Sequence, residues 1–154
     1  MALQLRRPGL LLSTIHVVLL CTTVFAVSMH FVYSTYYIGL IITALGLLCL
    51  FSLKLFKIKI KSVQPDVVFG VIDNGILAAL ALFGSEIAGV AGALIGGVVG
   101  NAVTDGIAGL FEGYWAEHAT NTKRTVLGSA VGKMAGCLIG AGVVLLIGNL
   151  YLNL

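Results

Sequence analysis

Five long apolar stretches decide how this chain can fold. Each is roughly 20 residues long, the length at which an α-helix spans the hydrocarbon core of a bilayer. Of the 154 residues, 59% are hydrophobic and 10% are charged, too apolar a balance for one water-soluble core of this size. The sequence predicts an all-α, polytopic integral membrane protein with five transmembrane helices, over about residues 9–29, 33–53, 67–83, 86–111 and 126–148.

The basic residues lie at the ends of these stretches. With five crossings, eight of the nine Lys and Arg residues fall on one side of the membrane. By the positive-inside rule this is the cytoplasmic or mitochondrial matrix side. The net charge of +3 thus reflects topology, and we expect a lipid bilayer rather than nucleic acid as partner. Lysine and isoleucine alternate from Lys57 to Lys61, which indicates a chain on the membrane surface or a short strand.

Composition changes across a charged linker that ends at Gln64-Pro65-Asp66. Seventeen of the twenty glycines lie at Gly70 or later. We therefore predict two units. Residues 1–62 form an N-terminal two-helix transmembrane hairpin with a basic loop, and residues 66–154 form a Gly-rich three-helix membrane core that carries a polar site.

Glycines recur at every fourth position in two of the predicted helices. One stripe contains Gly92, Gly96 and Gly100, and the other contains Gly128, Gly132, Gly136 and Gly140. Such glycine zippers let helix backbones approach closely in lipid. The packing is either within one chain or between two copies, and we expect a homodimer through the glycine faces.

Three intramembrane charges are predicted at one depth, about 10 Å below the basic face: Asp73, Asp105 and Lys133. An ionised group in hydrocarbon costs about 2.5 to 3.5 kcal/mol or more, so it usually faces a partner, a cavity or an ion. Asn101, Asp105 and Glu112 share one helix face. The sequence Asp73-Asn74-Gly75 is a turn signal, so we expect the third helix to be broken there.

These groups predict a cation site. Two carboxylates and one lysine leave one negative charge uncompensated, and a hard cation prefers oxygen ligands. The candidate ligands are Asp73, Asn74, Asn101 and Asp105, and the accessory residues are Thr104, Glu112 and Lys133. Lys133 adds a positive charge that competes with a cation. The alternative is a buried ion-pair network that only locks the bundle.

The polar elements resemble the core of the transmembrane protein 65 family over about residues 67–148. They are Phe69 to Asn74, Gly100 to Gly109, and the Gly128 to Gly140 stripe with Gly136-Cys137. The resemblance implies a three-helix membrane core linked to sodium-dependent calcium efflux in mitochondria. Asp73, Asn74, Asn101 and Asp105 would then be its cation ligands.

We therefore expect a membrane cation transporter or antiporter of sodium/calcium type, with no cofactor other than transported Ca²⁺ or Na⁺. The alternative is a non-transporting structural or regulatory subunit that packs against another membrane protein. An enzyme is not expected, since neither GxSxG nor HExxH occurs. A prokaryotic plasma membrane is favoured over the mitochondrial inner membrane. His16 is expected to be structural rather than a ligand, and the three cysteines to be small buried hydrophobes.

Overall fold

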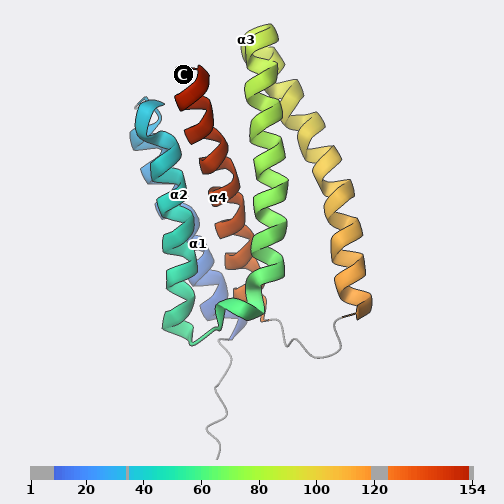
Figure 1. Cartoon of the computed structure of the whole chain (residues 1–154). Coiled ribbons are helices and arrows are strands. Elements are labelled where there is room, and N and C mark those ends of the chain that lie inside the picture. Colours follow the sequence, from blue (N-terminus) through green and yellow to red (C-terminus); the bar gives the residue numbers. More distant parts are fainter. Residues whose placement is uncertain (1–8, 34, 119–124, 153–154) are drawn as a thin grey trace, which may run out of the picture.

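The computed structural model describes residues 9–33, 35–118 and 125–152, and in these ranges every regular element is a helix. The elements are α1 (Leu10–Phe31), α2 (Thr35–Ser52), the short 3-10 helix η1 (Leu53–Phe56), α3 (Ile60–His118) and α4 (Val126–Leu152) (Figure 1). Over the same ranges, four helices are long and apolar enough to cross a membrane. The all-α prediction is thus confirmed.

The helix α3 reverses direction near its middle and forms two antiparallel arms, residues 60–87 and 90–118 (Figure 1). Gly89 at the reversal has φ 56° and ψ −135°, a conformation that side-chain-bearing residues rarely adopt. A Cβ atom on Gly92 would overlap the carbonyl oxygen of Gly84, and one on Gly100 would lie 3.0 Å from the Cα of Leu77. The first glycine stripe therefore joins the two arms within one chain.

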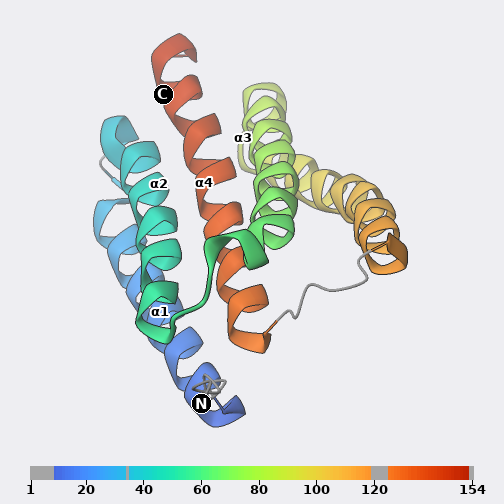
Figure 2. The ribbon, with the colours of Figure 1, turned by 60° about the horizontal axis from the view of Figure 1, so that its bottom comes forward.

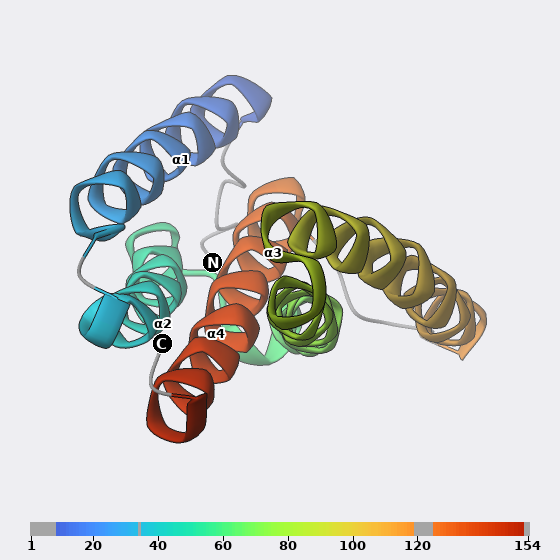
Figure 3. The ribbon, with the colours of Figure 1, turned by 90° about the horizontal axis from the view of Figure 1, so that it is seen from above.

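The helix α4 lies between α2 and the first arm of α3 (Figure 3). Its glycine stripe faces α3: a Cβ on Gly132 would lie 3.1 Å from the Cβ of Asp66, and one on Gly136 would overlap a backbone carbonyl of α3. On the opposite side, a Cβ on Gly39 of α2 would lie 2.7 Å from the backbone nitrogen of Leu146. Both predicted stripes are thus occupied by contacts inside the chain.

A buried cluster joins all four helices and η1 near the start of α3. Its members are Leu20, Cys49, Leu53, Val63, Leu127, Val131 and Ala135. His16 adds a polar contact beside it. The Ser52 hydroxyl donates to the Cys49 carbonyl at 2.7 Å, so its oxygen accepts the 3.0 Å hydrogen bond from Nε2 of His16. His16 is thus hydrogen-bonded within the chain, as expected from the sequence.

The predicted linker is wrong in its second half. Lys57 ends η1 in the left-handed conformation, and α3 begins at Ile60, so Gln64, Pro65 and Asp66 are helical. The alternative of a short strand through Lys61 is wrong, because Ile60 and Lys61 are already helical. Pro65 lies in the second turn of α3, where it removes one backbone hydrogen bond and its ring crowds the Lys61 carbonyl, which favours a kink. The first turns of α3 accordingly run at an angle to the rest of the arm (Figure 1).

The predicted helix break at Asp73-Asn74-Gly75 is also wrong, because the only non-helical residues inside α3 are Ala88 and Gly89. A Cβ atom added to Gly75 would instead lie 3.9 Å from the Cα of Gly140, in ordinary van der Waals contact with α4. Close packing and the cost of unsatisfied backbone groups in lipid favour a continuous helix there. Of the cysteines, Cys49 is buried and Cys137 half-buried, whereas Cys21 is exposed, contrary to expectation.

Candidate functional site

Asp73 and Thr104 meet where the two arms of α3 face each other. The Thr104 hydroxyl donates a short hydrogen bond to Oδ1 of Asp73. Thr104 is 1% exposed, and Asp73 is half-buried. Thr104 continues the inward row of Gly92, Gly96 and Gly100 by one more step of four residues. The glycine stripe that brings the arms together therefore also directs this hydroxyl at the carboxylate.

The Thr104 hydroxyl has one proton but more than one acceptor. Its Oγ1 lies 3.0 Å from the carbonyl oxygen of Gly100 and 3.1 Å from that of Asn101. An ionised Asp73 receives the proton of Thr104. If a cation were bound at Asp73, Thr104 would donate to its own helix and its lone pair would face the cation instead. The pair therefore accommodates Asp73 with or without a cation without moving a helix.

Asn101 and Asp105 form a separate pair on the second arm. The Asn101 amide Nδ2 donates to Oδ2 of Asp105 at 3.0 Å, and the contact is exposed. Asn101 comes directly after Gly100, and Asp105 directly after Thr104. Because one residue turns an α-helix by about 100°, each side chain lies to one side of the inward-facing row. The pair therefore flanks the contact between the arms. Beyond it, the second arm diverges from α4 and from the first arm (Figure 2).

The other predicted site residues have different surroundings. Asn74 is half-buried on the first arm, about 100° around the helix from Asp73. Lys133 of α4 is half-buried, and its Nζ lies 4.4 Å from the ring centroid of Phe69. Glu112 has a side chain outside the described residues. Asp73 and Asp105 thus belong to two arrangements, one enclosed and one exposed.

Asp66 was missed as a site residue because its position after Gln64-Pro65 indicated a linker. It is 1% exposed and accepts a 2.7 Å hydrogen bond from Oγ of Ser129 in α4. A signal was available, since Asp66 and Asp73 are seven residues apart and share one helix face. The first arm therefore carries one buried carboxylate, Asp66, and one half-buried carboxylate, Asp73, each of which accepts a hydrogen bond from a hydroxyl of another helical segment.

The described residues contain no group of three or more His, Cys, Asp and Glu side chains that could hold a metal ion. A cation at Asp73 would therefore need hydroxyl, carboxamide or backbone oxygens as further ligands.

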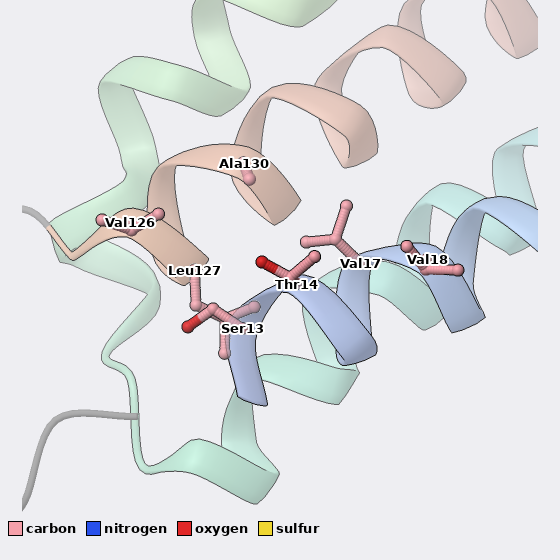
Figure 4. A pocket seen from close by; sticks show the side chains of 7 residues that line it. All are labelled: Ser13, Thr14, Val17, Val18, Val126, Leu127 and Ala130. Carbon is pink, nitrogen blue, oxygen red and sulfur yellow. The ribbon is translucent and has the colours of Figure 1, made fainter. Parts of the chain in front are cut away.

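A pocket of about 220 Å³ lies elsewhere, between α1 and the start of α4 (Figure 4). Its lining residues are Ser13, Thr14, Val17, Val18, Val126, Leu127 and Ala130. The Ser13 and Thr14 hydroxyls donate to carbonyls of α1 at 3.1 Å and 3.0 Å. The pocket therefore offers apolar surface, suited to a hydrocarbon chain rather than to an ion.

Among the described residues, Asp73 with Thr104 and Asp66 with Ser129 are thus two pairs in which a hydroxyl of another helical segment donates to a carboxylate. No protein-family model, curated protein or solved structure matches this chain.

Proposed function

We propose that the chain crosses a membrane five times and moves cations past Asp73. The five crossings would be α1, α2, the two arms of α3, and α4. The first arm has 28 residues by its bounds of 60–87, about 42 Å of helix at about 1.5 Å per residue. The basic end of the bundle then contains Lys54, Lys57, Lys59 and Lys61, near the anionic headgroups that favour lysine.

The observation that carries the transport proposal is the Asp73–Thr104 pair between two apolar arms. Placing a carboxylate in such apolar surroundings costs free energy. Carboxylates that occur there therefore commonly mark an ion or proton pathway. The Thr104 hydroxyl donates to the carboxylate, and its oxygen would coordinate a bound cation. Sodium and calcium both prefer such oxygen ligands. We therefore propose exchange of sodium-type and calcium-type cations at Asp73, with Asn74 as a neighbouring ligand.

A second candidate function is a non-transporting subunit of a larger membrane assembly. The exposed Asn101–Asp105 pair favours it, because a polar pair on the outside of an apolar helix is stabilised by a partner in lipid. A homodimer is one form of this proposal. Its contact would lie on this flank, because both glycine stripes are occupied inside one chain.

Ion flux into proteoliposomes tests the two candidates. Radioactive sodium and calcium uptake would be measured for the wild type, Asp73→Asn and Glu86→Gln. Glu86 is exposed near the reversal of the same helix, so its variant makes the matched change from carboxylate to carboxamide. We expect sodium-dependent calcium uptake in the wild type and Glu86→Gln, and its loss in Asp73→Asn.

Equal uptake by Asp73→Asn and the wild type would refute the site. Absence of uptake by a folded wild type would favour the subunit. In that case Asp105→Asn should weaken association with the partner or second copy, as measured by crosslinking in native membranes.

A further inference from the structure

One face of the first arm of α3 carries Asp66, Phe69 and Asp73, at spacings of three and four residues. Such spacings place the three side chains in a row along the helix. Phe69 lies about 4.5 Å along the axis from Asp66 and about 6 Å from Asp73. The ring therefore separates the two carboxylates.

Lys133 reaches this row from α4. Its Nζ lies 4.4 Å from the Phe69 ring centroid, within the range of a cation–π contact. Its backbone is held at the same level, because an added Cβ on Gly70 would lie 2.5 Å from the Lys133 carbonyl oxygen. The ammonium group is therefore positioned over the ring, with one carboxylate about one helical turn away on either side.

We infer that Lys133 is a tethered counter-cation that competes with the transported cation for Asp66 and Asp73. This rests on the proposed transport at Asp73. Two carboxylates and one ammonium leave one negative charge, which a single monovalent cation neutralises. The lysine side chain has a flexible four-carbon stem and a compact charge. In the structure it lies over Phe69 while Asp73 accepts from Thr104, so its positive charge opposes a cation at either carboxylate.

The inference predicts opposite effects from removing either charge. Lys133→Gln should tighten sodium binding by at least about tenfold, because Coulomb's law gives about that factor for a unit charge about 10 Å away at an effective dielectric constant of about 20, and more at shorter distances. Asp66→Asn should weaken it by a similar factor. The double variant keeps the wild-type net charge and should bind sodium with nearly the wild-type affinity.

Equilibrium binding of radioactive sodium to the purified protein is the test, alongside flux. Lys133→Arg retains the charge and should stay close to the wild type, whereas a purely structural role for Lys133 would make both substitutions weaken binding. Unchanged or weaker binding in Lys133→Gln, or additive losses in the double variant, would overturn the inference.

The binding assay separates this inference from the transport proposal. Sodium binding that rises in Lys133→Gln without any flux would support the counter-cation and refute transport. Absence of binding in both the wild type and Lys133→Gln would refute both. Phe69→Leu removes the ring but no charge, and it should shift the affinity far less than Lys133→Gln does.

Discussion

Replacing Gly70 with alanine tests whether close backbone contact holds α3 against α4. An alanine Cβ would lie 2.5 Å from the Lys133 carbonyl oxygen and 2.6 Å from the Cys137 nitrogen. Both are backbone atoms of a packed helix, so neither moves aside as a flexible side chain would. The helices must therefore separate by about 1 Å to restore ordinary van der Waals distances.

The cost follows from the contacts that this separation weakens. If one turn of the interface packs as a buried leucine does, it makes roughly 40 to 60 contacts of about 0.1 to 0.2 kcal/mol, and a gap of up to about 1 Å forfeits a quarter to a half of that energy. At the middle of these ranges of contact number and contact energy, the loss is about 2 to 4 kcal/mol. Alanine returns about 1 kcal/mol through its higher helix propensity. The net expected destabilisation is about 1 to 3 kcal/mol, typical of an overpacked core.

The measurement is unfolding in mixed micelles with increasing fractions of sodium dodecyl sulfate, followed by far-ultraviolet circular dichroism. Gly97→Ala is the matched control, because it lies in the same helix and an added Cβ meets nothing within 4 Å. It should share the propensity gain and be as stable as the wild type or more so. If Gly70→Ala and Gly97→Ala unfold at the same fraction of sodium dodecyl sulfate, the close-contact account of the interface is refuted.

Three further predictions use the same unfolding assay. Gly89→Ala should destabilise the protein by about 1 to 3 kcal/mol, because the reversal of α3 needs a positive φ; wild-type stability would contradict this account. Thr104→Val should cost about 1 to 3 kcal/mol by removing the donor to a half-buried carboxylate. The same substitution in an Asp73→Asn background should cost less, and equal costs would rule out the pairing. Ser129→Ala should likewise cost about 1 to 3 kcal/mol, whereas the exposed Thr22→Ala should change little.

Much of the fold could be predicted from hydropathy. The expected spans at residues 9–29, 33–53 and 126–148 match α1, α2 and α4 to within a few residues at most ends. The third and fourth spans correspond to the two arms of α3, but the first arm begins at Ile60 rather than near Val67. The difference arises because lysines and a proline lower hydropathy without preventing a helix. Hydropathy detects the apolar length of a helix, not its end.

The candidate site was predicted in its members but not in its pairing. Asp73 and Thr104 were both named from sequence, yet they are 31 residues apart, and only the antiparallel arms make them neighbours. Asn101 and Asp105 are four residues apart in one helix, so their hydrogen bond follows from local geometry. Asp66 was missed because burial depends on α4, which contributes Ser129 from 63 residues away.

By itself, the sequence determined the all-helical class, the apolar segments and the stripes along which backbones can touch, because hydropathy and residue spacing act locally along the chain. Tertiary structure decided which stripe meets which helix, that α3 reverses at Gly89 and stays helical through Gly75, and that Asp66 is buried. These outcomes depend on competition among surfaces distant in sequence, whose packing energies no local pattern contains.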